Sequence, residues 1–537
     1  MQNRNNLRLY EFHRSLYLKA LQNASHHTPL DTPNLLRYAE EFYKSLPKKY
    51  KESHVNALIR DLEKKDLLIY GDFHTHWQTQ KGLIRILEQQ LTFHPEREVV
   101  ISVEMFRASD QVHINRYLRD EITEDALLEA VEYDRFWGFP WENYRMIVNF
   151  AKANDIAVFG INSDEAGRDS LATRDSFAAE VIADLSKRYP ESLNVCLIGE
   201  FHLADEHLPK QLTPYKIRHL RVLTNIDQFY FDRKTYTDYS KNEYLYLKEG
   251  LYCLLNSPPW IKWQSYSLWE EMKSAEEEED ESDLYTDESF DIDGQIQGLL
   301  QQINEFLNLN ISEIELTNFN SSSFLTAAEL SHIASRKDVS SYSSAILEQR
   351  LAIDKHFYLP ERRLCLINKV SLNHLASLSG QILFSMLHPI KDLSDDEEIF
   401  FHRILMISSG ILTVKILNPR FKCPDIFSFE ADLKRLNRRR LGSGDQTYRK
   451  ALRYVIKLYY KILLGRYRIS KQIASYDREN HGLYSLMIGQ LIGVETYKLI
   501  MNPYYGHDFK DSLQFRTSDT ESCKALIKSI LNAISRL

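Results

Sequence analysis

The sequence predicts an α/β protein with a mainly parallel sheet covered by helices on both faces, followed by a mostly α-helical C-terminal domain. Between residues 60 and 230, short apolar runs alternate with amphipathic segments, a pattern typical of crossover units and a buried parallel sheet. From residue 295 to 537, helical periodicity dominates and strand signals are few. A length of 537 residues is ample for more than one domain.

The elements follow in order along the chain. Residues 1–59 are expected to form a helical N-terminal segment. The five predicted strands of the 60–230 domain are "DLLIYG", "EVVISVEMF", "DIAVFGINS", "NVCLIGEFH" and "IRHLRVLTN". Helix-like stretches such as "QKGLIRILEQQL" and "RDSFAAEVIADLSKRY" connect them. Each crossover is expected to be right-handed, which places the carboxyl ends of these strands at one edge of the sheet.

The remaining segments differ in composition. Residues 231–269 form an aromatic-rich extension, for which core packing or an aromatic contact surface is the expected role. Residues 270–293 contain 13 acids and one Lys, so we expect an acidic linker or solvated loop over 270–294. Residues 295–537 are interpreted as an all-α domain of unknown function.

One motif occurs twice. Gly71-Asp72-Phe73-His74 ends the first predicted strand, and Gly199-Glu200-Phe201-His202 ends the fourth. Glycine at such a point permits a tight turn or close approach to a ligand. Glu104 ends the second strand, where a buried carboxylate is costly unless it is paired or ligating.

These residues predict a shared site. His74, Glu104 and His202, with Asp72 and Glu200 beside them, could ligate zinc, iron or manganese, or act as acid and base in catalysis. Shared ligation would bring the coordinating atoms of the first three within about 4 to 5 Å of each other. His76 and His207 are expected either to support the site or to lie on the surface.

The motifs resemble those of the Tiki/TraB/ChaN superfamily, which includes haem-binding uptake and erythromycin-esterase-like proteins. "SVEMF" is similar to its strand-borne Glu, and Trp137, Trp141, Tyr144 and Asn162 are similar to its ChaN-type pattern. The resemblance covers roughly residues 60 to 215. It implies a ChaN-like fold that binds haem or iron, with Tyr144 and Asn162 as candidate cofactor-binding residues.

Three functions therefore remain open. The first is haem or metal binding between the two GxxH loops. The second is a hydrolase of the Tiki or erythromycin-esterase type, in which His74, Glu104 and His202 hold a metal or act directly as base and acid. The third is a non-catalytic platform whose helical domain binds a partner.

Partners and location are indicated only in outline. Thirteen Lys or Arg and one acid lie between Lys434 and Lys471, interleaved with tyrosines, so this stretch could bind a partner or an anionic surface, or simply be a solvated helix face. No nucleotide-binding or zinc-finger motif gives a strong nucleic-acid signal. No signal peptide, lipobox or transmembrane segment is recognised, and the five cysteines are far apart, so a cytoplasmic protein is expected.

Overall fold

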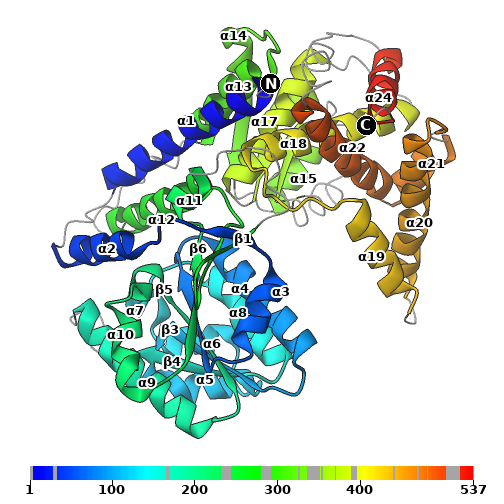
Figure 1. Cartoon of the computed structure of the whole chain (residues 1–537). Coiled ribbons are helices and arrows are strands. Elements are labelled where there is room, and N and C mark those ends of the chain that lie inside the picture. The colour runs from blue at the N-terminus through cyan, green and yellow to red at the C-terminus, as the bar shows by residue number, and fades with distance from the viewer. Residues whose placement is uncertain are drawn as a thin grey trace. The chain divides into compact units, whose positions relative to one another are not determined.

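The computed structural model contains two compact units, residues 16–287 and residues 1–15 with 288–537, which are described separately (Figure 1). The described residues are 4–27, 33–164, 170–231, 243–279, 292–323, 327–335, 351, 355–368, 370–388, 396–438, 442–468, 471–480, 482–502 and 520–535.

The unit of residues 16–287 is built on an eight-stranded sheet. Its strands lie in the order β1-β7-β8-β6-β2-β5-β3-β4, and all neighbouring pairs are parallel except those that β7 makes with β1 and β8. This confirms the predicted mainly parallel α/β fold. The strands are β1 (Lys51–Ser53), β2 (Leu67–Asp72), β3 (Val99–Arg107), β4 (Ala157–Asn162), β5 (Leu193–Gly199), β6 (His219–Thr224), β7 (Tyr244–Lys248) and β8 (Leu251–Leu254).

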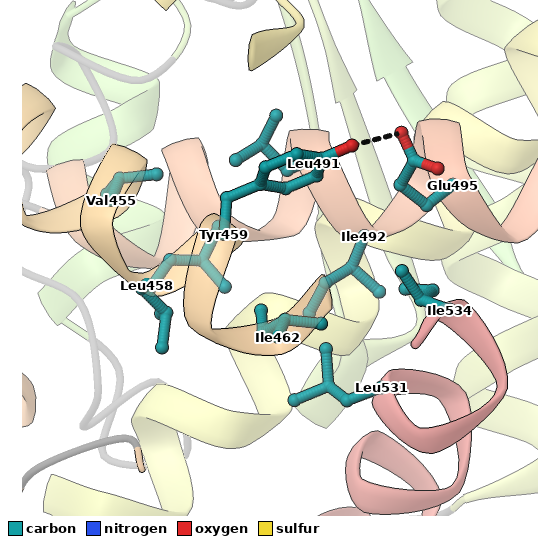
Figure 2. Close-up of a pocket in the computed structure, with 10 residues that line it drawn as sticks. Val455, Leu458, Tyr459, Ile462, Leu491, Ile492, Glu495, Leu531 and Ile534 are labelled. Atoms are coloured by element: carbon teal, nitrogen blue, oxygen red, sulfur yellow. Dashed lines mark hydrogen bonds between the residues drawn. The ribbon is translucent and has the colours of Figure 1, made fainter. Parts of the chain in front are cut away.

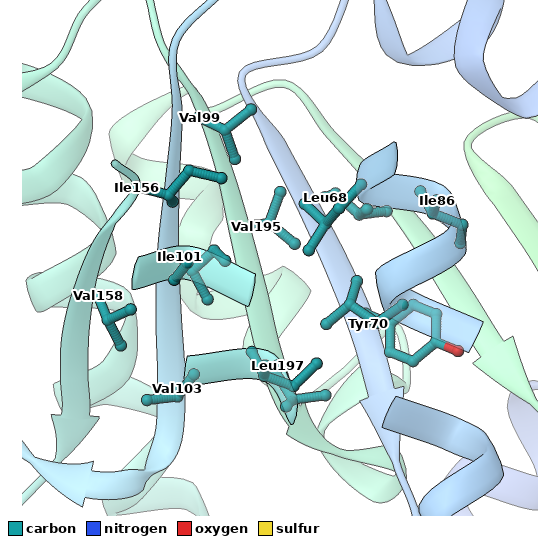
Figure 3. Close-up of a cluster of buried hydrophobic side chains, with 14 of the residues drawn as sticks. Leu68, Tyr70, Ile86, Val99, Ile101, Val103, Ile156, Val158, Val195 and Leu197 are labelled. Atoms are coloured by element: carbon teal, nitrogen blue, oxygen red, sulfur yellow. The ribbon is translucent and has the colours of Figure 1, made fainter. Parts of the chain in front are cut away.

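Helices cover both faces of this sheet, because β2 and β5 are buried along their whole length and expose no polar face. One face packs on α3 (Val55–Leu62), α4 (Trp77–Phe93), α5 (Gln111–Leu118) and α8 (Trp141–Ala153). Figure 3 shows the core of that face, where Leu68 and Tyr70 of β2 lie beside Val195 and Leu197 of β5.

The opposite face packs on α2 (Pro33–Ser45), α9 (Leu171–Arg188), α10 (Leu208–Leu212) and α11 (Asp227–Phe231). Further elements are the helices α1 (Arg4–His27), of which residues 16–27 belong to this unit, α6 (Glu124–Ala130), α7 (Tyr133–Phe136) and α12 (Pro259–Glu279), and the 3₁₀ turns η1 (Ala108–Asp110), η2 (Glu200–Leu203) and η3 (Thr213–Tyr215).

Helix α4 approaches the sheet closely at Gly82. A Cβ atom at this position would lie 2.5 Å from the Tyr70 hydroxyl and 2.7 Å from Leu254 Cδ2. Any larger side chain would therefore push the helix away from β2.

Three strands of the sheet lie outside the five that the sequence predicts. β1 interrupts the expected helical segment 1–59, and β7 and β8 come from the aromatic-rich extension. A three-residue edge strand and a hairpin of four- to five-residue strands are too short to give a clear period-two pattern. Helix α12 runs ten residues into the acidic segment, to Glu279, because Glu is a good helix former. Residues 280–291 of the predicted linker lie outside the described residues.

The second unit is mostly helical. Its helices are α13 (Ile292–Leu307), α14 (Glu313–Leu316), α15 (Ala327–Ser335), α17 (Leu372–Leu387), α18 (Asp396–Leu417), α19 (Ile426–Leu436), α20 (Ser443–Leu463), α21 (Lys471–Glu479), α22 (Leu483–Met501) and α24 (Thr520–Ile534), with the 3₁₀ turn η4 (Pro360–Arg362).

The expectation that residues 295–537 are all-α is wrong. A small sheet in the order β10-β11-β9 is formed by β9 (Asn320–Ser323), β10 (His356–Leu359) and β11 (Leu364–Ile367). Residues 360–363 join β10 and β11, and Arg363 adopts a left-handed φ of 52° there. Each of these strands has four residues. Helical periodicity is recognised over a longer window, so strands this short do not show in the sequence pattern.

Helix α18 forms the centre of this unit, between α17 and α22. Its residues Ile399–Leu417 are long and apolar enough to cross a membrane by composition, and 67% of that window is buried inside the structure. Gly489 and Gly493 of α22 pack against Ile407 and Ile411 of α18, so small residues bring these helices close together. Burial of this extent fits a core helix.

Candidate functional site

The two repeated motifs lie side by side at the carboxyl edge of the large sheet, because β2 and β5 are neighbours. Gly199 marks the meeting point. A Cβ atom at Gly199 would lie 3.4 Å from each of three atoms: Glu104 Oε2, His202 Cδ2 and His74 Cε1. The structure therefore brings His74, Glu104 and His202 together, and their roles as ligands or catalytic groups stay predictions.

His74 is oriented by a carboxylate. Its Nδ1 lies 2.9 Å from Asp72 Oδ2, and the buried Asp72 also accepts hydrogen bonds from Gln80 Nε2 at 2.6 Å and the Tyr144 hydroxyl at 2.7 Å. A carboxylate acceptor at Nδ1 favours the tautomer with its proton on that nitrogen and its lone pair on Nε2. The His74 side chain is 24% exposed, so the imidazole ring is partly open to solvent.

Aromatic rings surround His74. The ring centroids of Trp137 and Phe139 lie 4.7 Å and 4.6 Å from that of the imidazole, and Trp269 of α12 stacks on Phe139 at 4.4 Å. The Asn143 side-chain amide donates to the His74 carbonyl at 3.1 Å, which fixes the loop backbone. The aromatic-rich extension therefore contributes to the surroundings of the first motif.

His202 lies in a buried ionic network. Its Nδ1 contacts Asp175 Oδ1 at 2.6 Å, and its Nε2 lies 3.5 Å from Glu104 Oε1. Glu104 also accepts from Arg174 and from the Gly199 backbone N–H, the latter at 2.7 Å. Burial alone would lower the pKa of His202, but the carboxylates of Glu104 and Asp175 raise it to about 9.

Glu104 remains ionised in this network. Burial opposes its charge, yet Arg174 and His202 hold the pKa of this carboxyl well below its usual range. Two cations thus alternate with two anions, and the Tyr38 hydroxyl donates to Asp175. Because their polar atoms already bind one another, Glu104 and His202 are not open to an added ligand.

The predicted metal site is not supported. Within the described ranges, no group of three or more His, Cys, Asp or Glu side chains is placed to hold a metal ion. Asp72 and Glu200 do not complete such a set, because they lie at different positions of the sheet edge.

This separation follows from the strand register. Asp72 pairs with Gly199 and Gly71 with Ile198, so the two copies of the motif are staggered by one residue. Asp72 is the last residue of β2, whereas Glu200 lies one residue beyond β5 and begins the 3₁₀ turn η2, so the two acids occupy different positions at the sheet edge. Asp72 faces α8, which carries Tyr144, whereas Glu200 lies among the groups of α11 and α12.

Glu200 is buried, and the burial raises the pKa of its carboxyl to about 7, although Lys262 opposes this shift. Lys262 itself is buried and paired with Asp227, whose Oδ1 lies 2.7 Å from Nζ. Lys262 Nζ also donates to the Asn225 carbonyl at 3.1 Å. The second acid thus lies near the Lys262–Asp227 pair, and Asp72 and His74 of the first motif also act on its charge.

The candidate cofactor residues from the resemblance lie beneath the surface. Tyr144 is buried, and its pKa is raised well above the usual value by burial and by Asp72. The Asn162 side-chain amide donates to the Glu104 carbonyl at 3.0 Å and so supports the end of β3. The exposed Asp164 accepts from Ser109 instead of joining the site.

His76 and His207 are both buried, which rules out a surface position for either. His207 Nδ1 lies 2.6 Å from the Phe201 carbonyl oxygen, and its Nε2 lies 2.9 Å from Glu41 Oε2. The His207 ring also stacks on Tyr38 at 3.5 Å. His207 therefore supports the second motif through its contact with the Phe201 carbonyl oxygen.

Sequence reasoning missed Arg174, Asp175, Gln80 and Trp269. Arg174 and Asp175 lie near the start of α9, and Asp175 is buried. Their adjacent opposite charges on an otherwise apolar helix face were the available signal. The sequence alone does not show which strand end these two residues contact, because that depends on the fold.

A pocket in the second unit is lined almost entirely by apolar side chains of α20, α22 and α24 (Figure 2). Glu495 is its charged member, and it accepts from Tyr459 at 3.2 Å and from Lys498 at 2.7 Å. With its one carboxylate already paired, the pocket lacks a polar group that could orient a ligand.

Comparison with known proteins confirms the ChaN resemblance. Residues 58–173 match the family model described as "Haem-binding uptake, Tiki superfamily, ChaN". A solved structure titled "Cofacial heme binding to ChaN of Campylobacter jejuni" matches at 14% identity and a TM-score of 0.26, with 33% of this chain and 88% of that chain covered. None of the curated proteins compared with this chain matches it.

Proposed function

We propose that the 60–230 domain binds haem and that His74 supplies the nitrogen ligand. The observation that carries this proposal is the partly exposed His74 ring, whose Nδ1 is held by Asp72 at 2.9 Å. A histidine ligand to iron typically binds through one nitrogen while a carboxylate or carbonyl accepts from the other. The match of residues 58–173 to a haem-binding family model supports the same ligand class.

The residues around His74 fit such a group. Trp137 and Phe139 offer partly exposed aromatic surface beside the imidazole, and a porphyrin is a large planar apolar ring. Haem, when bound, would supply a redox-active iron. In this proposal Asp72 orients the His74 ring, and Tyr144 holds Asp72 in place instead of acting as a ligand.

A second candidate is hydrolysis with His74 as general base. The same Asp72–His74 pair orients the imidazole for proton transfer, as a carboxylate does for the histidine of a hydrolytic triad. This form needs no metal, in line with the lack of a metal-binding cluster among the described side chains. It uses His74 as acceptor of a proton from water or a substrate hydroxyl.

Haem titration of the purified full-length chain tests the first proposal. Wild type should give a saturable Soret shift, and His74→Ala should abolish it or move its position. His94→Ala is the matched control, because His94 caps the far end of α4 and pairs with Glu63 at 3.3 Å. Tyr144→Phe should keep the Soret position, since the Tyr144 hydroxyl contacts Asp72 Oδ2 at 2.7 Å and His74 Nδ1 at 3.2 Å and in this proposal is not a ligand.

The outcomes separate the alternatives. If wild type shows no Soret shift, or His74→Ala behaves like wild type, the haem proposal with His74 as ligand is wrong. Ester or amide turnover that is lost in His74→Ala and insensitive to chelators would favour the hydrolase. If neither haem binding nor turnover is seen, the platform interpretation remains.

A further inference from the structure

Helices α19 and α20 of the second unit form a hairpin (Figure 1), and the end of the hairpin opposite its connecting loop is an exposed apolar tip. The start of α19 and the end of α20 meet there, because the Tyr460 hydroxyl donates to Glu430 Oε1 at 2.6 Å. Phe427 is 72% exposed and Leu464 is 70% exposed, and Leu463 is exposed beside them. Large apolar side chains gathered at one point of a surface usually mark an interaction site.

A row of cations leads to this tip. Lys450, Arg453, Lys457 and Lys461 are all exposed and recur at spacings of three or four residues, so they share one face of α20. The row from Lys450 to Leu464 extends about 21 Å along the helix. Arg466 and Arg468, just beyond the helix, are exposed as well.

The opposite face of α20 is already occupied. Val455, Leu458, Tyr459 and Ile462 are buried and point toward α22 and α24 (Figure 2). This packing fixes which side of the helix faces outward. The exposed cations are therefore presented by a helix that is anchored in its unit.

Among the described residues, none of the four cations of the row forms an ion pair with an acid. Asp432 pairs with Arg435 at 2.8 Å and accepts from Tyr448 at 3.1 Å, and Glu430 accepts from the neutral Tyr460 hydroxyl and keeps its charge. Asp445 is the one acid in the sequence between Lys434 and Lys471. The face thus carries a strong positive charge next to its apolar tip.

We propose that this face of the α19–α20 hairpin docks on an anionic lipid bilayer, with Phe427, Leu463 and Leu464 entering the acyl boundary and the cation row contacting lipid headgroups. Charge complementarity selects an anionic partner. The aliphatic leucines select a lipid surface over a nucleic acid, because nucleic acids are gripped by phosphate contacts and aromatic stacking. A row about 21 Å long fits a helix lying in the plane of the interface.

Vesicle co-sedimentation of the full-length chain tests this proposal. Wild type should bind phosphatidylcholine vesicles that contain phosphatidylserine, and it should bind weakly to phosphatidylcholine alone. Lys457→Gln with Lys461→Gln should weaken binding roughly 30-fold, at about fivefold for each cation near the surface. Phe427→Ser with Leu464→Ser should weaken binding at least about tenfold and leave helicity by circular dichroism unchanged, since both side chains are exposed.

Ile314→Ser is the matched control. Ile314 is 84% exposed in the same unit, but it lies between Glu313 and Glu315, so it should not contribute to binding. The proposal is overturned if wild type fails to bind anionic vesicles, or if the tip variant binds as wild type does. It is likewise overturned if the control loses as much affinity as the tip variant, or if an oligonucleotide binds while vesicles do not.

Discussion

Glu104→Gln is the change that most directly tests the buried ionic network. Gln has the shape of Glu and keeps an oxygen that can accept the Gly199 N–H bond, so packing should be preserved. What is lost is the negative charge between Arg174 and His202. The buried His202 would then keep one carboxylate partner, Asp175, and the partly buried Arg174 would lose its ion pair with Glu104.

The magnitude follows from the geometry. At 3.5 Å and an effective dielectric constant of about 20, the Glu104–His202 attraction alone is about 5 kcal/mol. The neutral side chain recovers part of this, because a charge no longer has to be desolvated. Breaking a buried pair from one side typically costs about 3 to 5 kcal/mol, which is the loss in unfolding free energy expected here.

Urea unfolding followed by tryptophan fluorescence measures this loss. All six tryptophans lie between residues 77 and 269, so their emission reports on the unit of residues 16–287. Glu96→Gln is the control, because Glu96 is well exposed and its Oε1 lies 3.6 Å from His94 Nδ1, away from the buried network. A loss below about 1 kcal/mol for Glu104→Gln would refute the network as described.

The pH dependence of this stability loss shows whether it comes from the lost charge or from altered packing. The folded-state pKa of His202 is raised to about 9, so its stabilising contribution is complete below its ordinary value near 6.5 and is lost as pH rises through 9. The cost of Glu104→Gln should therefore shrink above pH 9. An equal cost on both sides of that range would point to a packing defect instead.

Two further changes use the same assay. The pKa of Glu200 is raised to about 7, so its contribution to stability is fully present below about pH 4.5 and is lost as pH rises through 7. The Gln side chain of Glu200→Gln stays neutral at every pH. The unfolding free energy of this variant should therefore match that of wild type at pH 4.5 and exceed it by up to about 3 kcal/mol at pH 8. Stability that does not differ at pH 8 would contradict this. Gly82→Ala should destabilise the unit by about 1 to 3 kcal/mol, because its Cβ would meet Tyr70 and Leu254, and a neutral effect would show that α4 can shift freely.

The sheet could be predicted from the sequence where its strands are long and apolar. β2, β3 and β5 are six to nine residues long and almost wholly buried, so each is visible as an uninterrupted apolar run. β1 reads Lys-Glu-Ser and is a strand only because β7 pairs with it. Such strands are created by tertiary contacts, which local composition does not encode.

The candidate site could be predicted in part for a similar reason. His74, Glu104 and His202 stand at strand ends, and parallel topology alone brings them to one edge. Their partners Arg174 and Asp175 come from a helix, whose rotation about its own axis decides which side chains face the edge. His74 is partly open to solvent, whereas His202 is enclosed by these partners. This difference could not be inferred from the repeated motif.

The one-residue stagger between the two motifs also gives their acids different neighbours. Asp72 faces Tyr144 of α8, whereas Glu200 lies near Lys262 of α12, although Asp72 and His74 still act on the charge of Glu200. Exchanging the two four-residue motifs would place a longer acid against Tyr144 and a shorter one near Lys262, so the copies should not be interchangeable despite their likeness. The repeat thus gives one sheet edge two different environments for the same four-residue motif.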